Sequence, residues 1–204
     1  MKGLIKSNLY VISNNAVMIL KGCLAYTLAY VALMLIFPTY QYTFFYGFIM
    51  SIVLGFVIIP WEAISKSNQS NWDMFSVTLP ISRKEIVLSN YVTFLICSCL
   101  GIIIGLLIGL SMSMFLSEVD ATKVLSIVSA GFIYIFLTPA IVYPLIFMYG
   151  TSRIEVIHSL ALVTVTVVFM IAIETNIAMG VLISMLAFIL SCFLSVKVFE
   201  NKDL

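Results

Sequence analysis

Uncharged apolar runs make up most of this chain, and short charged clusters separate them. The runs cover residues 22–61, 86–117, 124–152, 156–173 and 175–196. A helix that crosses the hydrocarbon core of a bilayer needs about 20 consecutive apolar residues. The first run is twice that length, and Pro38-Thr39-Tyr40-Gln41 in its middle has the composition of a turn. The pattern therefore predicts six transmembrane helices.

The predicted fold class is an all-α polytopic membrane protein, with a single transmembrane domain over residues 1–204. Only Glu174 and its neighbours separate the last two spans, so we expect a tight hairpin there. Ser82 and Glu85 match a capping box, which predicts that the third span starts near Arg83, before its apolar run. We place the six spans at residues 22–38, 42–61, 83–116, 124–149, 156–173 and 176–197, followed by a tail at 198–204.

Residues 1–20 have the pattern of an amphipathic helix that lies along the membrane surface. Polar residues lie elsewhere around the helical wheel from an apolar set that consists of Ile5, Leu9, Ile12, Ala16 and Ile19. Such a helix rests in the headgroup layer, and an irregular tail is the alternative. Ser and Asn residues interrupt the continuous apolar core that a signal peptide needs, so we expect the segment to be retained.

The composition supports a membrane location. Hydrophobic residues make up 63% of the chain and charged residues 9%, whereas soluble globular proteins have about 45–50% apolar and about 25% charged residues. Too little polar surface exists to cover a water-soluble molecule of this size. The net charge is only +1, and no basic cluster occurs, so we expect no nucleic-acid partner.

The distribution of Lys and Arg predicts the orientation. Six spans place both chain ends on one side of the membrane. Of the 10 Lys and Arg residues, only Lys123 then lies on the other side. Because cytoplasmic loops carry an excess of Lys and Arg, we expect both termini in the cytoplasm and the chain in a bacterial cytoplasmic (inner) membrane. The outer connections are very short, so we expect no external domain.

Residues that carry chemistry are scarce and form no catalytic or metal-binding pattern. The G-x-x-x-x-G-K-[ST] run that binds nucleotide phosphates does not occur, so another polypeptide must supply any ATP hydrolysis. No charged residue lies clearly at mid-membrane, which counts against an ion-coupled carrier. Ser111 and His158 belong near opposite ends of their predicted spans, too far apart for a serine-protease pair. The four cysteines form no C-x-x-C pair, so we expect no metal site.

Two groups of residues within the spans are candidates for packing or for a hinge. Gly101, Gly105 and Gly109 recur every four residues and lie on one face of the third span. Small residues at this spacing let another helix approach closely, either within the chain or across a dimer interface. Pro139 and Pro144 lie inside the fourth span and remove backbone donors there, which gives a fixed kink or a hinge.

The connection at residues 62–82 between the second and third spans is the most informative segment. After a polar stretch, residues 72–79 are apolar again but too short to span, and Pro80 ends them. An exposed apolar patch in the cytoplasm is typical of a site that binds a partner, and Trp and Phe are typical interface anchors. The segment therefore predicts a short helix that docks on a partner protein, with a second interfacial helix on the lipid headgroups as the alternative.

The stretch from Trp72 to Val87, WDMFSVTLPISRKEIV, resembles a segment common in small ABC-2-type transporter permeases. In that family a short helix ends in a Leu-Pro-x-Ser-Arg-x-Glu-like stretch that enters the third helix. The layout is also similar, with an interfacial N-terminal segment, six spans and about 200 residues. Within the family the chain is most similar to membrane subunits of small bacterial exporters, including the phenol-soluble modulin exporter.

The resemblance implies a half-transporter. Two six-helix subunits, identical or paralogous, would form the pathway, and two copies of a separate ABC ATPase would bind ATP and Mg²⁺. The chain itself would bind no cofactor and would not be an enzyme. The residues that would couple it to the ATPase are Trp72, Asp73, Met74, Phe75, Val77, Leu79 and Arg83.

The expected cargo is an amphipathic peptide, such as an antimicrobial or cytolytic one. This expectation rests mostly on the resemblance and partly on an uncharged, aromatic-rich interior. The short connection after Glu174 leaves no room for a large external gate, which counts against polysaccharide export. Export of lipids or hydrophobic drugs is an alternative, and so is a non-transporting membrane scaffold or sensor subunit.

Overall fold

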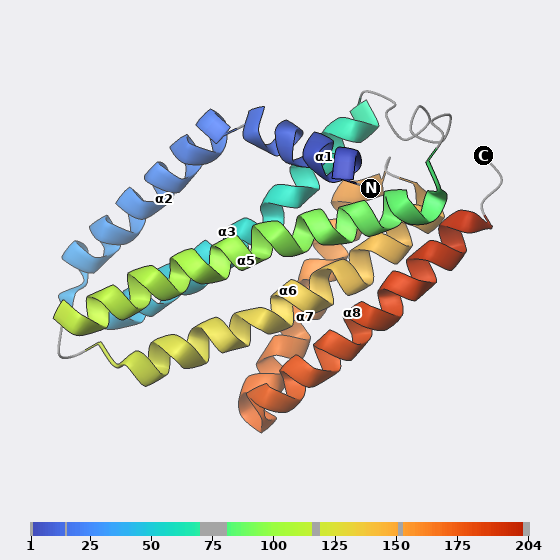
Figure 1. Cartoon of the computed structure of the whole chain (residues 1–204). Coiled ribbons are helices and arrows are strands. Elements are labelled where there is room, and N and C mark those ends of the chain that lie inside the picture. The colour runs from blue at the N-terminus through green and yellow to red at the C-terminus, as the bar shows by residue number, and fades with distance from the viewer. Residues whose placement is uncertain (1, 15, 70–80, 116–118, 151–152, 202–204) are drawn as a thin grey trace.

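The computed structural model describes residues 2–14, 16–69, 81–115, 119–150 and 153–201. Across these ranges the chain is helical apart from short connections and contains no strand, which confirms the predicted all-α fold class. The helices, shown in Figure 1, are α1 (Lys2–Asn14), α2 (Ala16–Ile36), the 3₁₀ turn η1 (Pro38–Tyr40), α3 (Gln41–Gln69), α5 (Arg83–Phe115), α6 (Ala121–Tyr149), α7 (Ile154–Thr175) and α8 (Ile177–Glu200).

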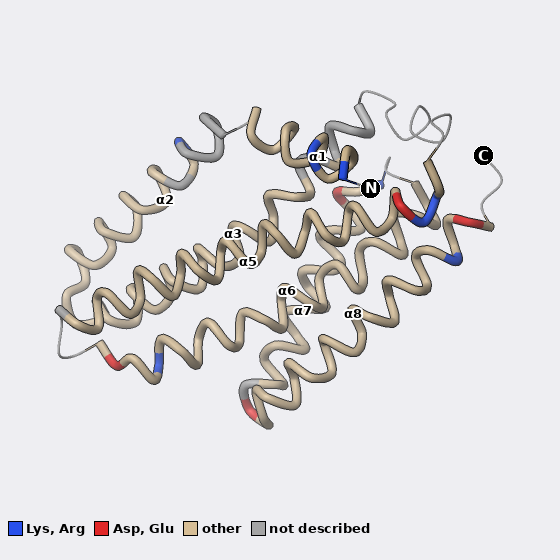
Figure 2. Tube along the Cα trace, in the orientation of Figure 1, with Lys and Arg blue, Asp and Glu red and all other residues tan. Residues whose placement is uncertain are grey.

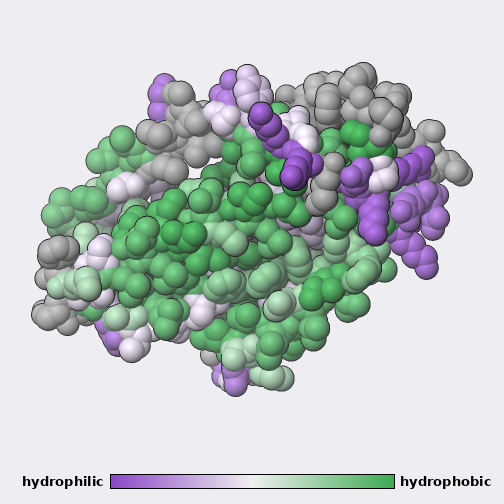
Figure 3. Space-filling model, in the orientation of Figure 1, coloured by the Kyte–Doolittle hydropathy of each residue, from purple (hydrophilic) through white to green (hydrophobic). Residues whose placement is uncertain are grey.

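Five of the described helices are long and apolar enough to cross a membrane, namely α3, α5, α6, α7 and α8. In α2, which has 21 residues, the apolar stretch among the side chains that the structure describes is Leu24–Ile36. The chain is therefore a multi-pass membrane protein, and the sixth span stays a prediction. Charged residues gather at two ends of the bundle and leave uncharged helix between them (Figure 2). The surface between these ends is mostly hydrophobic (Figure 3).

The end of the bundle that holds Lys2, Lys84 and Lys197 is called the basic end below. It contains α1, the first turns of α5 and the last turns of α8 (Figure 1). The opposite end contains the turn between α7 and α8 and the start of α6. Its charged residues include Asp120, Lys123 and Glu174. This distribution follows the sequence prediction of one basic side.

Helix α6 lies at the centre of the bundle and packs against α3, α5, α7 and α8. Half of its most apolar window is buried within the chain (50%), whereas only 11% of the corresponding window of α8 is buried. Most of α8 therefore faces lipid or another protein. Helix α2 leans away from the bundle, packs mainly on α3, and has no fully buried side chain among its described residues.

Local capping groups move several helix ends away from the predicted boundaries. Helix α6 begins at Ala121 because Asp120 caps it, with its carboxylate accepting from Thr122 N at 2.8 Å. The hydrogen bonds from Thr122 hold the pKa of Asp120 below its usual range. Asn176 is the whole connection between α7 and α8, and its side chain accepts from the amides of Ala178 and Met179. The expected tight hairpin is confirmed.

Two differences from the prediction lie near the basic end. The interfacial helix predicted over residues 1–20 ends at Asn14, and residues 16–20 belong to α2. The last two residues of α1 are Ser13 and Asn14, and Ser and Asn favour helix ends over helix interiors. Helix α3 continues through Pro60 to Gln69 instead of ending at 61, because the residues that follow Trp61 include good helix formers such as Glu62, Ala63 and Lys66.

Candidate functional site

The predicted docking segment lies between two described helices. Residues 72–79, which carry Trp72, Asp73, Met74, Phe75, Val77 and Leu79, are outside the described residues. Helix α3 reaches Gln69 on one side of the segment, and α5 starts at Arg83 on the other. The described part of the chain therefore fixes where this connection leaves the bundle and where it returns, both at the basic end.

The return point is built by the predicted capping box. The hydroxyl of Ser82 accepts from the amide of Glu85 at 3.3 Å. The Ser82 carbonyl also accepts from the amide of Ile86. These bonds satisfy amides in the first turn of α5 that have no partner inside the helix. The predicted N-cap at Ser82 is confirmed.

Arg83 is the one predicted coupling residue in the described part of the chain, and it contacts α8. Its Nη1 atom donates to the carbonyl of Phe199 at 3.1 Å and to that of Glu200 at 3.2 Å. Its guanidinium carbon lies 6.0 Å from the centre of the Phe199 ring. The last carbonyls of a helix lack intrahelical partners and carry partial negative charge, so a guanidinium there is favourable.

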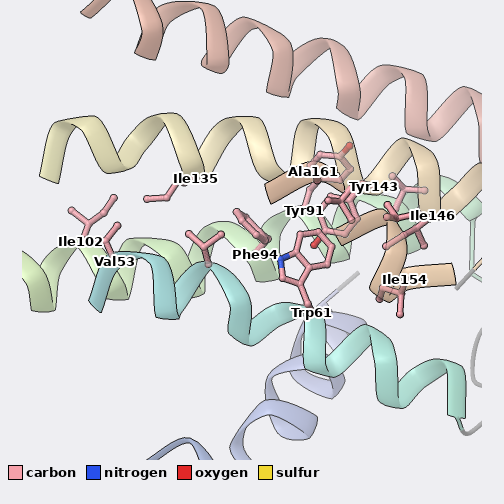
Figure 4. Close-up of a cluster of buried hydrophobic side chains, with 14 of the residues drawn as sticks. Val53, Trp61, Tyr91, Phe94, Ile102, Ile135, Tyr143, Ile146, Ile154 and Ala161 are labelled. Carbon is pink, nitrogen blue, oxygen red and sulfur yellow. The ribbon is translucent and has the colours of Figure 1, made fainter. Parts of the chain in front are cut away.

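An aromatic cluster fills the bundle interior near the basic end, formed by Trp61, Tyr91, Phe94, Tyr143 and His158. Trp61 lies at its centre, with its ring 5.1 Å from that of Tyr143, 5.6 Å from His158 and 5.7 Å from Phe94. The rings of Tyr91 and Tyr143 are 4.5 Å apart. Figure 4 shows Trp61 of α3, Tyr91 and Phe94 of α5, and Tyr143 of α6 converging on one another. The cluster joins α3, α5, α6 and α7.

Hydrogen bonds extend this cluster to α8 and to α1. The Tyr91 hydroxyl is hydrogen-bonded with Ser191 at 2.6 Å and with Ser195 at 2.9 Å. Tyr143 donates to the carbonyl of Asn90 at 3.1 Å, and the amide group of Asn8 donates to the side chain of Asn90 at 3.0 Å. Sequence analysis missed these contacts. The spacing of the two serines by four residues was the available signal, because it places them on one face of a helix.

The three glycines predicted to lie on one face of the third span all face neighbours within the chain. A Cβ atom at Gly101 would lie 2.5 Å from Cβ of Phe56, and one at Gly105 would lie 3.2 Å from a methyl group of Val53. At Gly109 it would overlap a methyl group of Val124. The glycines therefore let α5 approach α3 and α6 closely. A role in a dimer interface stays a prediction.

Both predicted hinge residues lie inside α6, which runs without interruption from Ala121 to Tyr149. Pro139 is buried and Pro144 is half-buried. Because proline has no amide hydrogen, the carbonyls of Ile135 and Ala140 lose their usual intrahelical donors. The two prolines flank the turn of α6 that delivers Tyr143 to the aromatic cluster. The hinge role stays a prediction.

Several buried polar atoms have no partner within the described part of the chain, namely Trp61 Nε1, His158 Nε2, Ser98 Oγ and Thr138 Oγ1. Ser111, the other residue of the rejected protease pair, donates to the carbonyl of Ile108. No group of three His, Cys, Asp or Glu side chains that could hold a metal ion occurs among the described residues. The described geometry offers packing, hydrogen bonding and an apolar surface.

An apolar pocket opens in the half of the bundle away from the basic end. Its volume is about 350 Å³, near the lower limit of about 300 Å³ for ligand sites. Helices α3, α6, α7 and α8 all contribute to its wall. The lining residues are Tyr46, Gly47, Met50, Ser126, Ile127, Ala130, Phe169 and Ile177.

Comparison with known proteins identifies the family of this membrane protein. No curated protein and no solved structure matches the chain at a significant level. Residues 3–200 match the family described as ABC-2 family transporter protein, so the match covers nearly the whole chain. The match includes the capped start of α5, where the sequence resemblance was found, and confirms that resemblance to an ABC-2-type permease. The chain belongs to the ABC-2 family of transporter proteins.

Proposed function

We propose that this chain is the transmembrane subunit of an ABC exporter in a bacterial cytoplasmic membrane. Membership of the ABC-2 family makes it a membrane component of an ABC transporter and implies association with an ABC ATPase subunit. In the proposal, two six-helix subunits form the pathway, and two ATPase subunits bind at the basic end, which faces the cytoplasm. ATP and Mg²⁺ bind the ATPase, while this chain binds no cofactor and catalyses no reaction.

The observation that carries the proposal is the family match combined with the position of the 62–82 connection. The connection leaves from α3 and returns at the capped start of α5, and both helices join the aromatic cluster inside the bundle. Movement of the connection is therefore applied to helices that pack on α6. The proposed contacts of residues 72–79 with the ATPase rest on the sequence of this segment and on the family resemblance.

The proposed cargo is an amphipathic peptide, similar to the cargo of phenol-soluble modulin exporters. Support comes from the uncharged helices between the two charged ends. An uncharged wall suits the apolar face of a helical peptide, because desolvation costs little there. The same features suit lipids or hydrophobic drugs, so a transport assay has to separate these cargo classes.

The coupling role is tested by replacing the aromatic anchors of the segment. Trp72→Ala with Phe75→Ala removes the two largest apolar side chains, and such anchors typically contribute at least 2 kcal/mol each to an interface. Because about 1.4 kcal/mol corresponds to tenfold in affinity, we expect the variant to lose on the order of a thousandfold in affinity for the co-expressed ATPase in pull-down from nanodiscs. Tyr149→Phe is the control, because Tyr149 is an exposed aromatic residue elsewhere at the basic end.

Transport by vesicles that contain both subunits then assigns the function. A fluorescent amphipathic helix should move only with ATP, and the double variant should not move it. Unchanged ATPase binding by the double variant would rule out the docking role. Binding of the ATPase without movement of peptide, lipid or hydrophobic drug would favour a scaffold or sensor subunit, and transport without ATP would favour an ion-coupled carrier.

A further inference from the structure

Helices α5 and α8 run antiparallel at the basic end and are joined by polar contacts at two levels. At the first level Arg83 donates to the carbonyls of Phe199 and Glu200. At the second level Tyr91 is hydrogen-bonded with Ser191 and Ser195. A rise of 1.5 Å per residue separates the two levels by about 12 Å along α5. These four bonds form what is called the α5–α8 seam below.

The seam matters because α8 has few other directional contacts. Only 11% of its most apolar window is buried within the chain. In a bilayer, apolar helix faces gain no hydrophobic energy by packing on each other instead of on lipid tails. Hydrogen bonds, in contrast, have a required geometry and fix one register. The seam therefore gives α8 a defined register against α5, in addition to the packing of α8 on α6.

Arg83 makes the stronger contact of the seam. Its bonds are charge-assisted, and hydrogen bonds of this kind are about twice as strong as neutral ones. They lie at the C-terminus of α8, where the helix dipole favours a positive charge. Lys84 is exposed and its side chain takes no part in the seam. One of two neighbouring cationic residues is thus positioned by the fold, while the other faces solvent.

Side chains of α6 contact both α5 and α8 beside the seam, so the three helices form one packed unit. The ring of Phe199 lies 5.0 Å from that of Phe147, and Phe147 stacks on Tyr143 at 6.3 Å. Tyr143 in turn contacts Tyr91 of α5. A path of touching side chains therefore leads from Arg83 through α8 and α6 back to α5. All of these residues lie near the basic end, where the 62–82 connection enters α5.

We propose that Arg83 and Tyr91 fasten the cytoplasmic halves of α5 and α8 into one unit, so that displacement of the 62–82 connection also moves α8. Arg83 is then a positioning residue that acts inside the chain rather than a contact of the ATPase. The source of the displacement rests on the proposed function, but the fastening itself does not. Helix α8 becomes the element that carries the motion to the lipid-facing side of the bundle.

The fastening is tested first in the purified chain alone, in nanodiscs, by amide hydrogen exchange. Arg83→Ala should raise exchange in the last turns of α8 by about tenfold or more, the loss expected for charge-assisted bonds. Tyr91→Phe keeps the ring and should raise exchange around Ser191 and Ser195 by about twofold to tenfold. The control Arg153→Ala removes an exposed arginine that precedes α7 and should change neither region. Exchange in α8 equal to that of the control would overturn the proposal.

The coupling is tested next in the complex with the ATPase, by comparing nucleotide-free and ATP-trapped samples. The wild type should show a nucleotide-dependent change in exchange along α8. Arg83→Ala and Tyr91→Phe should lose that change while the ATPase stays bound, which a purely stabilising role would not produce. Arg83→Lys keeps the charge but not the forked donor, and should retain part of the change.

The two proposals fail in different ways. If no ATPase binds the wild-type chain, the proposed function fails, while exchange in the chain alone still decides the fastening. If the ATPase binds and the α8 change persists in both variants, the coupling through the seam is wrong and the proposed function stands. If Arg83→Ala releases the ATPase while exchange in α8 stays at the control level, Arg83 is an interface residue and the inference is wrong.

Discussion

Single buried hydroxyl groups in this bundle differ in whether another helix provides them with a partner. Ser191 and Ser195 are buried and bond with Tyr91. Ser98 and Thr138 are equally buried but have no partner in the described part of the chain. Removing a partner leaves a buried group unsatisfied, whereas removing a group without a partner is neutral or favourable. The same chemical change should therefore have opposite effects at these positions.

This contrast gives a prediction for a matched set of serine variants. Ser191→Ala combined with Ser195→Ala leaves the buried Tyr91 hydroxyl unpaired and should cost about 1–3 kcal/mol. At about 2–4 °C per kcal/mol, thermal unfolding in nanodiscs should show a clearly lower midpoint. Ser98→Ala should leave the midpoint unchanged or raise it. A loss in Ser98→Ala as large as in the double variant would contradict the assigned hydrogen bonds.

The sequence predicts local contacts of single residues well and distant ones poorly. Ser82 was predictable as an N-cap because its partner Glu85 lies three residues away. The bond between Tyr91 and Ser191 joins residues that are far apart in the chain, and many other pairs of buried polar residues would fit the same pattern equally well. The contact of Arg83 with the end of α8 was missed for the same reason.

Among whole helices, the packing of α5 on α3 depends on the glycine face. Phe56 and Val53 of α3 occupy the space that side chains at Gly101 and Gly105 would need. Val53 is fully buried and cannot move aside easily. Small residues let helices in a membrane approach closely enough for backbone and side-chain packing. The α3–α5 contact should therefore be sensitive to a single added methyl group.

The corresponding prediction compares glycines in the two facing helices. Gly101→Ala places a methyl group 2.5 Å from the Phe56 Cβ atom, and overpacking of this kind costs about 1–3 kcal/mol. The variant should unfold at a lower temperature. Gly55→Ala in α3 meets no atom within 4 Å, and it should be neutral or slightly stabilising because alanine favours helix. Equal unfolding temperatures for the two variants would show that the glycine face is not in close contact.

The sequence predicts which segments are helical, and in what order, better than it predicts the residues at which each helix begins and ends. Long uncharged runs determine where a chain can cross a bilayer, and the five described helices long enough to span lie within or around these runs. Ends depend on capping and on local competition for backbone hydrogen bonds. Asp120 therefore starts α6 before its apolar run, and α1 ends at Ser13 and Asn14, earlier than the amphipathic pattern suggested.

In the molecule as a whole, the separation of charge along the bundle implies an orientation. The basic end holds both the start of α1 and the end of α8 (Figure 1). The other end holds only a few charged residues. If α2 crosses the membrane, six spans return the chain to its starting side, and the positive-inside rule places the basic end in the cytoplasm. The position of α2 at the edge of the bundle makes it the span in need of a direct test.

We predict the labelling pattern of three cysteine variants in intact cells. Lys123→Cys should react with a membrane-impermeant maleimide from outside, because it lies at the end opposite to the basic end. Lys84→Cys and Lys2→Cys should react only after the cells are permeabilised. The unsubstituted chain is the control for native thiols. External labelling of Lys2→Cys with internal labelling of Lys84→Cys would mean that α2 does not cross and that the chain has five spans.

The one-residue turn at Asn176 also constrains how the protein is made. Because Asn176 alone joins α7 and α8, the adjoining ends of these two helices stay next to each other. Insertion of one helix into the lipid therefore brings the adjoining end of the other helix with it. We expect the pair to enter the bilayer together, as a hairpin. If translation stops between these helices, α7 is made without α8 to pair with. Lengthening the turn should allow α7 and α8 to insert separately.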